Sequence, residues 1–464
     1  MEGPYELHHA GGGAAPEDLE LVRAIEQPGI GFRVAFTSLG AVILLVWVLF
    51  SRQLLYGLGV TGLNQPVTWG FYIVNFVFFI GISHAGTLIS AILRLSKAEW
   101  RRPITRMAEV ITVIVLAIGG FHPVLDLGRP ERVMNIYTAG RLQSPLLWDV
   151  TSISAYFMAS TVYLYIPMIP DIAILRDRGT RPRWLYRFLA WGWQGTARQH
   201  KVLERAISIM MVLVIPIAVS VHTVISYIFA MTLQPGWHST IFGPYFVVGA
   251  IFSGIAALLV VMIVLRKVFH LQRYLKEIHF DHLSKLLLVM SLLWFYFTFS
   301  EYLTAFFGHE PSEMRVLLYK LSGPYAPYFW GMVACNFVVP VLILSFRRTR
   351  RIPGILLASI LVVIGMWLER LNIVVPALAN PRLPFPTGFY VPSLVEWAMF
   401  LGGIATFVLG FALFSRFFPL VSIWEMREGR ATSVAVTVDR VRSYLPDPQP
   451  PNREAGLAEA GGKT

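Results

Sequence analysis

Residues 206–232, AISIMMVLVIPIAVSVHTVISYIFAMT, form a continuous apolar run without Lys, Arg, Asp or Glu. About 20 apolar residues are enough for an α-helix to span a bilayer, so this run predicts a membrane-spanning helix. Further apolar runs lie on both sides of it. We predict ten spans in all, at residues 34–51, 69–93, 107–122, 147–170, 206–232, 241–265, 286–305, 327–346, 353–377 and 391–415.

The composition of the 464 residues also indicates an all-α polytopic membrane protein. Hydrophobic residues make up 55% of the chain and charged residues 14%, whereas soluble domains contain roughly a quarter charged residues. The apolar runs are continuous and do not alternate, which argues against a membrane β-barrel. The single cysteine, Cys335, excludes a disulfide framework and a metal site made of several thiolates. Any iron–sulfur centres would therefore belong to a partner. We also predict no metal site in this chain.

Charge predicts the orientation of the chain. The net charge of +12 arises from Lys and Arg between apolar runs, so no nucleic-acid partner is predicted. The loops on one side hold 22 Lys and Arg and those on the other side hold 7. The positive-inside rule makes the first side cytoplasmic and, with ten spans, places both termini there. We call the helix ends on the Arg-rich side inner and the opposite ends outer.

The N-terminal region has no apolar core of the kind found in a signal peptide. The first thirty residues instead contain six Asp and Glu. We therefore expect no cleavable signal peptide and expect the first span to act as its own anchor.

An internal repeat predicts how the spans are grouped. Residues 144–149, SPLLWD, open the fourth span and resemble residues 326–331, APYFWG, which open the eighth. Both place Pro in the first helical turn. We predict two copies of a four-helix bundle in one orientation, flanked by the first and last helices. The predicted division is a cytoplasmic N-terminal segment at 1–33, a flanking helix and outer loop at 34–68, a first bundle at 69–232, a second bundle at 233–378, a last flanking helix at 379–418 and a cytoplasmic tail at 419–464.

The two copies differ in their polar residues. Asp149 of the first bundle corresponds to Gly331 of the second. A charged group in lipid costs about 2.5–3.5 kcal/mol. Because the corresponding position of the second bundle has no carboxylate, a purely architectural role for the carboxylate of Asp149 is hard to defend. Asp149 is therefore predicted to be functional. His122 and His222 are expected to converge with it near the outer surface, with His84 deeper in the membrane.

Other polar residues allow two interpretations. Asp126 and Arg129 are expected to form an ion pair that fixes the loop after the third span. His84 and His222 could serve function or make only interhelical hydrogen bonds. In the second bundle and the tenth span, proton transfer and internal charge pairing are both open for a further set of residues, namely Glu301, Glu369, Arg370 and Glu396.

The chain resembles the NrfD/polysulfide-reductase family of membrane subunits. The resemblance rests on residues 126–130, DLGRP, on Thr68-Trp69-Gly70, on Trp148-Asp149 and on the doubled bundle. Ten spans and the chain length are similar to the quinol-oxidising subunit of bacterial alternative complex III. The resemblance implies a multi-pass inner-membrane subunit that binds menaquinol or ubiquinol near its outer, periplasmic surface. It also implies that electrons pass to a periplasmic iron–sulfur subunit, and that this chain holds no haem or cluster itself.

Site residues follow from the resemblance one by one. His122 and Asp149 match quinol-site positions, and Asp126 and Arg129 lie in the loop signature. Quinol oxidation releases two protons with two electrons, and an imidazole and a carboxylate can accept them. We expect Trp148 to hold the quinol ring. A proton relay is hypothesised through His84, His222, Glu301, Glu369 and Arg370.

Three other functions are consistent with parts of the sequence. A secondary transporter is suggested by the repeat and the intramembrane ionisable residues, although Pro216 in the fifth span corresponds to Val363 in the ninth. A di-haem cytochrome b could use His84 and His222 as ligands, but no second in-span histidine pair is present. A passive anchor would only hold the other membrane and cytochrome subunits of a respiratory complex.

Overall fold

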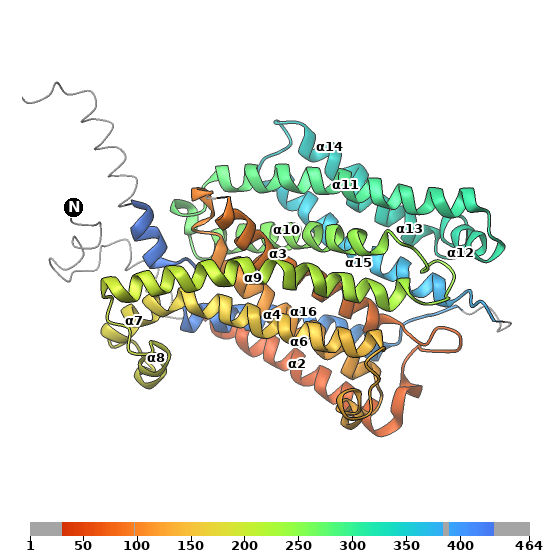
Figure 1. Ribbon diagram of the computed structural model, residues 1–464, viewed down its shortest axis with the longest axis horizontal. Helices are drawn as coiled ribbons and strands as arrows, with labels where there is room; N and C mark the ends of the chain where they lie inside the picture. The colour runs from red at the N-terminus through yellow and green to blue at the C-terminus, as the bar shows by residue number, and fades with distance from the viewer. Residues whose placement is uncertain (1–29, 97, 384–388, 431–464) are drawn as a thin grey trace, which may run out of the picture. The chain divides into compact units, whose positions relative to one another are not determined.

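The computed structural model describes residues 30–96, 98–383 and 389–430, and within these ranges it contains helices and no strand (Figure 1). The chain divides into a unit of residues 13–423 and a second unit made of 1–12 and 424–464. Only residues 424–430 of the second unit are described. Most of the predicted segments 1–33 and 419–464 therefore lies outside the described residues.

Ten helices in the described ranges are long and apolar enough to cross a membrane, which confirms the predicted number and the all-α class. They are α2 (Ile30–Tyr56), α3 (Phe71–Leu95), α4 (Thr105–Asp126), α6 (Pro145–Tyr165) extended by η5 (Ile166–Met168) and α7 (Ile169–Asp177), α9 (Ala197–Ala230), α10 (Phe242–Val268), α11 (Glu277–Gly308), α13 (Ala326–Val333) extended by η7 (Ala334–Val338) and α14 (Val339–Ser345), α15 (Ile352–Leu378) and α16 (Leu394–Phe417). Shorter helices in the connections are η2 (Gly57–Val60), η3 (Glu99–Arg101), η4 (Pro130–Arg132), α5 (Asn135–Thr138), α8 (Arg183–Leu189), η6 (Leu271–Arg273) and α12 (Pro311–Leu321).

Two helices begin about two turns before the predicted spans. α9 starts at Ala197 and α11 at Glu277. Thr196 and Gln199 form a capping box, in which each side chain accepts a hydrogen bond from the other residue's backbone N–H at 3.2 Å. Such a cap satisfies N–H groups that have no partner inside the helix. The helix is therefore extended into polar sequence that hydropathy alone does not include.

The long helices form two rings of four. In the first ring α3 contacts α4, α4 contacts α6, α6 contacts α9 and α9 returns to α3. The second ring repeats this order with α10, α11, α13–α14 and α15. This shared order supports the predicted division into two bundles, which remains a proposal. The rings join where α3 packs on α10, and α2 pairs with α16, which covers α3 and α4.

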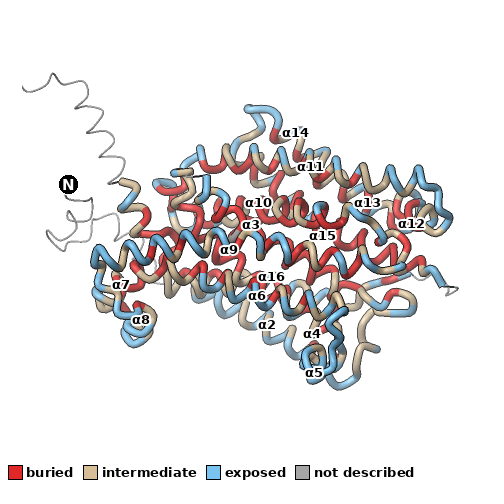
Figure 2. Tube along the Cα trace, in the orientation of Figure 1, coloured by how far each residue is buried: buried red, intermediate tan, exposed pale blue. Residues whose placement is uncertain are grey.

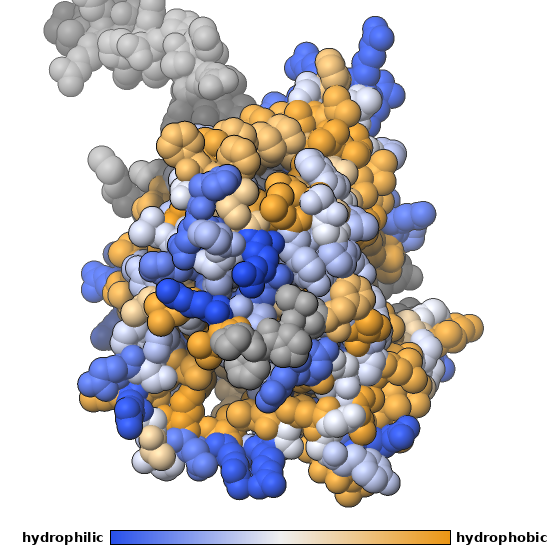
Figure 3. Space-filling view, turned by 90° about the vertical axis from the view of Figure 1, so that its right-hand side faces the viewer, coloured by the Kyte–Doolittle hydropathy of each residue, from blue (hydrophilic) through white to orange (hydrophobic). Residues whose placement is uncertain are grey.

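Burial follows this arrangement (Figure 2). Nearly all of α3 is buried, whereas Phe50 and Gln53 are the buried residues of α2. The exposed residues of α2 are mostly apolar, as expected of a helix that faces lipid. At the end of the bundle near α12, hydrophilic and hydrophobic side chains are mixed on the surface (Figure 3), as expected where the helices end in loops.

Candidate functional site

The outer ends of α4 and α6 position His122 and Asp149. Both side chains are buried, with exposures of 3% and 5%. Ile153 lies one turn after Asp149 on the same side of α6, and its methyl group is 3.7 Å from the place that a Cβ on Gly120 of α4 would take. The side of α6 that bears Asp149 therefore faces the outer end of α4.

Each of the two residues has a buried polar atom without a hydrogen-bond partner among the described residues. These atoms are Nε2 of His122 and Oδ1 of Asp149. Nδ1 of His122 lies 2.8 Å from the carbonyl oxygen of Ile118. A carbonyl can only accept, so Nδ1 donates and the neutral imidazole has an unprotonated Nε2. The imidazole can thus accept a proton at Nε2. No hydrogen bond joins the described side chains of His122 and Asp149.

Trp148 does not share the burial of Asp149. Its side chain is 37% exposed, and its indole N–H donates to the carbonyl oxygen of Leu142 at 2.5 Å. The counterpart Trp330 in the second bundle makes a similar bond to Leu321 at 3.1 Å. The structure therefore gives Trp148 a role in fixing the loop before α6. Its predicted contact with a ring stays a prediction.

The expected ion pair between Asp126 and Arg129 is not formed. Asp126 is half-buried at the end of α4, and its Oδ1 has no hydrogen-bond partner among the described residues. Arg129 is exposed, on the far side of Gly128, whose φ is +64°. The left-handed turn at the glycine carries Arg129 away from the helix end. Asp126 lies within electrostatic range of Glu396 and Tyr72 instead.

A buried hydrogen-bond network beside Asp126 was not predicted. The Tyr72 hydroxyl donates to Oε1 of Gln53 at 2.5 Å, and Nε2 of Gln53 donates to the carbonyl oxygen of Leu125 at 2.7 Å. The Glu396 carboxylate accepts a hydrogen bond from the Tyr390 hydroxyl. Burial and the Glu396 charge raise the pKa of Tyr390. The sequence held two signals for this network, namely Glu396 inside the tenth predicted span and Gln53 just after the first.

His84 and His222 lie together in the membrane. Their ring centroids are 3.8 Å apart, and both side chains are fully buried. Nε2 of His84 donates to the carbonyl oxygen of Ala218 at 2.7 Å, whereas neither nitrogen of His222 has a hydrogen-bond partner among the described residues. His222 therefore pairs with His84, and the expectation that His84 would lie deeper in the membrane than His222 is wrong. Rings in direct contact also leave no space for an iron atom between them.

Glu369 and Arg370 form an ion pair at 2.8 Å, although they are neighbours in sequence. Both are 1% exposed. The indole of Trp294 donates to Oε1 of Glu369 at 2.7 Å, and the Arg370 guanidinium lies 5.1 Å from the centre of the Phe246 ring. This arrangement is the internal charge pairing that the sequence left open.

Arg370 brings this pair to the junction of the two bundles. Nη2 of Arg370 is 3.0 Å from the place that a Cβ on Gly249 of α10 would take and 3.7 Å from the corresponding place on Gly81 of α3. Arg370 is also within electrostatic range of His222. The buried cation of the second bundle therefore approaches the histidine pair of the first.

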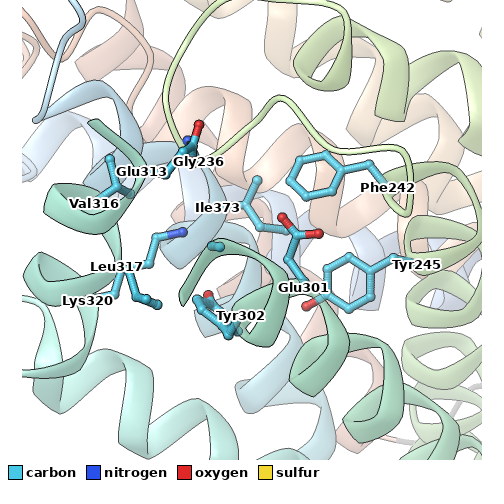
Figure 4. A pocket seen from close by; sticks show the side chains of 11 residues that line it. Gly236, Phe242, Tyr245, Glu301, Tyr302, Glu313, Val316, Leu317, Lys320 and Ile373 are labelled. Carbon is cyan, nitrogen blue, oxygen red and sulfur yellow. The ribbon is translucent and has the colours of Figure 1, made fainter. Parts of the chain in front are cut away.

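Glu301 lies at the outer end of the second bundle, in a small cavity of about 30 Å³ (Figure 4). Ser239 donates to its carboxylate at 2.5 Å. Lys320 of α12 lines the same cavity, with its ammonium 5.5 Å from the centre of the Tyr302 ring. Burial lowers the pKa of Lys320 to about 8, partly offset by Glu301 and Glu313. Burial also raises the pKa of Glu313.

A buried carboxylate near the inner end of the first bundle was also missed. Glu109 is 3% exposed, accepts a hydrogen bond from Ser90 at 2.7 Å and lies 3.9 Å from Arg94. The hydroxyls of Ser90 and Tyr163 are 3.3 Å apart. Glu109 falls inside the predicted third span, so the argument applied to Asp149 could have found it.

The fold and these groups define a class of protein, namely a polytopic helical membrane protein with buried acids and imidazoles along its interior. Comparison with known sequences gives the family. The chain belongs to the polysulphide reductase NrfD family, whose profile matches residues 59–381. This confirms the resemblance inferred from the sequence.

Three relatives illustrate the range of the family. A putative dimethyl sulfoxide reductase membrane subunit of Halobacterium salinarum is 26% identical, over 80% of this chain and 87% of that protein. A subunit of the selenate reductase of Mesobacillus selenatarsenatis is 23% identical, over 84% and 94%. The Hdr-like menaquinol oxidoreductase integral membrane subunit of Archaeoglobus fulgidus is 23% identical, over 80% and 90%.

Proposed function

We propose that this chain is the membrane subunit of a respiratory quinol oxidoreductase in a bacterial inner membrane, with both termini in the cytoplasm. It binds and oxidises menaquinol or ubiquinol at the outer, periplasmic ends of α4 and α6. Electrons pass to a periplasmic iron–sulfur subunit, as in alternative complex III, and other membrane and cytochrome subunits complete the complex. The substrate class is supported by relatives named as membrane subunits of a menaquinol oxidoreductase and a menaquinone reductase.

One observation carries the proposal, which is the pair of unpartnered atoms, His122 Nε2 and Asp149 Oδ1, on adjoining helix ends. Buried polar atoms in proteins nearly always have partners, and the two hydroxyls of a quinol would supply them. Oxidation breaks both O–H bonds. One proton goes to Nε2 of His122 and the other to the Asp149 carboxylate, while two electrons leave to the partner subunit. The products are the quinone and two protonated side chains.

The experiment is a quinol-oxidation assay on the purified complex with the Asp149→Asn and His122→Gln variants. Each substitution keeps the size of the side chain but removes a proton acceptor, so turnover is expected to fall about 100-fold or more. The matched control is Gly331→Ala, at the corresponding position of the second bundle, where the new methyl group would be 3.6 Å from its nearest neighbour, Leu368. Its turnover should be unchanged.

Thermal unfolding of each variant separates loss of chemistry from loss of fold. Normal turnover in Asp149→Asn would remove the assignment of this residue. Full turnover after loss of both side chains would instead support the passive-anchor function.

We further propose that protons move through the buried groups at the junction of the bundles, His84, His222, Glu369, Arg370 and, toward the outer surface, Glu301. The support is the contact between the two histidine rings and the approach of Arg370 to them. Tyr302 lies within electrostatic range of both Glu301 and Glu369. In His84→Ala and Glu369→Gln variants, the number of protons released or taken up per electron should fall. An unchanged proton stoichiometry in both variants would defeat the relay.

A further inference from the structure

The connection between α7 and α9, at the inner end of the first bundle, presents three large aromatic side chains to its surroundings. Trp184, Phe188 and Trp191 are 72%, 78% and 81% exposed. Trp184 and Phe188 are four residues apart in α8 (Arg183–Leu189) and lie on one side of it. Trp191 follows two residues after the end of the helix, in a turn where its φ is +43°. Single exposed apolar residues are common, but a group of large aromatics marks an interaction surface. We call these three residues the aromatic face.

The aromatic face is held in a fixed direction. On the opposite side of α8, Tyr186 is buried, and its hydroxyl donates to the carbonyl oxygen of Phe417 at 2.9 Å. At the end of α8, the carbonyl oxygen of Leu189 accepts a hydrogen bond from the Tyr165 hydroxyl at 2.6 Å. Tyr186 is two residues from both Trp184 and Phe188, a rotation of about 200° around the helix. Anchoring Tyr186 inward therefore directs Trp184 and Phe188 outward, and Trp191 in the following turn is exposed as well.

The surroundings of the aromatic face are basic. Residues 181–203 contain four arginines and one lysine and no Asp or Glu. Arg181, Arg183 and Arg187 are all exposed and lie on or next to α8. Arg183 donates through Nε to the carbonyl oxygen of Gly179 at 3.2 Å, which leaves the outer nitrogens of its guanidinium to bind another group. The charge of this surface is complementary to anions.

The position of α8 fits the surface of a bilayer. It follows α7, which continues the spanning helix α6, and it precedes the spanning helix α9. Figure 1 shows α8 beside α7 at one end of the long helices. This is the level at which spanning helices leave the hydrocarbon, where Trp side chains are enriched and basic residues meet lipid phosphates.

We propose that α8 and Trp191 form an interfacial anchor that binds anionic lipid headgroups at the inner end of the first bundle. The aromatic face enters the boundary between headgroups and acyl chains, and Arg181, Arg183 and Arg187 contact lipid phosphates. The combination of aromatic and basic groups without an acidic residue favours a lipid surface over a protein partner. This proposal is independent of the proposed quinol chemistry.

The test uses the full chain in nanodiscs of phosphatidylcholine, with and without phosphatidylglycerol. In a Cys335→Ser background, a fluorophore is attached to Phe188→Cys or to the control Gln272→Cys, an exposed position in another connection on the same side. Acyl-chain-brominated lipids should quench the first label and not the second. In mixed bilayers, the triple variant Arg181→Gln, Arg183→Gln, Arg187→Gln should retain at least about fivefold less phosphatidylglycerol than wild type.

Each other result overturns the proposal. An unquenched label at position 188 shows that the aromatic face does not enter the bilayer, and protection of that label by added partner subunits would assign it to a protein interface. Quenching that is equal in both lipids, with phosphatidylglycerol retention unchanged in the triple variant, would leave an aromatic anchor without headgroup recognition. A further variant replaces all three aromatic residues, as Trp184→Gln, Phe188→Gln, Trp191→Gln. If it folds, retains as much phosphatidylglycerol as wild type and keeps α8 at the same depth in the bilayer, the proposal is also contradicted.

Discussion

Glu396 shows how one carboxylate can join distant parts of the chain. It is fully buried at the start of α16, and it accepts hydrogen bonds from the backbone N–H of Gly62 at 2.7 Å and of Ser393 at 2.8 Å, as well as from the Tyr390 hydroxyl. Its removal leaves the buried Tyr390 hydroxyl and the half-buried N–H groups of Gly62 and Ser393 without this acceptor. A buried donor without a partner costs about 1–3 kcal/mol.

Glu396→Ala is therefore expected to lower the free energy of unfolding by about 2–4 kcal/mol, measured by thermal or denaturant unfolding in detergent. Glu396→Gln should lose less because its amide oxygen still accepts. The control is Glu99→Ala, whose side chain is 69% exposed and pairs with Arg102 at 2.7 Å, and which should change stability very little. Equal effects of Glu396→Ala and Glu99→Ala would contradict the role of Glu396.

Lys320 gives a prediction of pH dependence. Burial lowers its pKa from 10.5 to about 8, so the folded chain loses this proton at a lower pH than the unfolded chain. Between pH 8 and pH 10.5 the unfolded chain binds more protons than the folded chain, so the free energy of unfolding rises with pH. The rise attributable to Lys320 is on the order of 3 kcal/mol between pH 8 and 10.5.

The measurement compares wild type with Lys320→Met at pH 7.5 and at pH 9.5. Because the variant lacks the titrating group, the stability of wild type relative to the variant should increase at the higher pH. Parallel pH profiles for the two proteins would show that Lys320 titrates at its ordinary pKa in the folded state.

At the scale of elements, α3 and α4 approach closely at a glycine. A Cβ on Gly86 would lie 1.8 Å from the carbonyl oxygen of Ala108 and 2.1 Å from Oγ1 of Thr112. Small residues permit such contacts between membrane helices. Gly86→Ala would force the two helices apart and is expected to cost about 1–3 kcal/mol.

Gly243→Ala in α10 is the matched control because its nearest neighbour would be 3.9 Å away. There the gain in helix propensity should make the change neutral or slightly stabilising. Thermal unfolding of both variants checks the pair of predictions. A Gly86→Ala protein as stable as the control would contradict the close contact.

A buried ion pair holds three elements together at their inner ends. Arg106 of α4 pairs with Asp171 of α7, and Asp171 also accepts a hydrogen bond from the backbone N–H of Ile423, after α16, at 3.1 Å. Breaking a buried pair by removing one partner costs about 3–5 kcal/mol, whereas replacing both with apolar residues costs much less.

The single variants Arg106→Met and Asp171→Leu should therefore each unfold at markedly lower temperature than the double variant. The melting temperatures of wild type, the two single variants and the double variant form a double-mutant cycle. Additive effects of the two single changes would show that the pair contributes no coupling.

Sequence predicted the elements well where length and hydropathy determine them. Each predicted span corresponds to one long helix of the structure, because an apolar run has only one way to satisfy its backbone in lipid. The inner ends of α9 and α11 extend beyond the runs, since capping residues determine them. The π-helix η7 has no signal in the sequence. It depends on packing, with Ser291 of α11 donating to the carbonyl oxygen of Asn336 at 2.6 Å.

At the scale of the whole molecule, the sequence identified candidate site residues more reliably than it identified the residues that contact them in the fold. His84 and His222 were both selected, but their contact depends on how α3 and α9 pack in the first ring. The network of Gln53, Tyr72 and Glu396 joins helices from the two ends of the chain. Such contacts between remote segments come from the fold and not from local pattern.

The uneven distribution of Lys and Arg between the two sides of the membrane leads to a test of the whole arrangement. The positive-inside rule predicts that the connection with α8 lies in the cytoplasm and the loop before α6 outside. In a Cys335→Ser background, Gln194→Cys and Gln143→Cys put one exposed thiol on each side. A membrane-impermeant maleimide should label Gln143→Cys in intact spheroplasts and Gln194→Cys only in inverted vesicles. Gln143 is two residues before Pro145, where α6 begins, so its side is also the side of Asp149 and His122. Labelling of Gln194→Cys in intact spheroplasts would place the proposed quinol site at the cytoplasmic surface, and the electron-accepting subunit would then have to dock there.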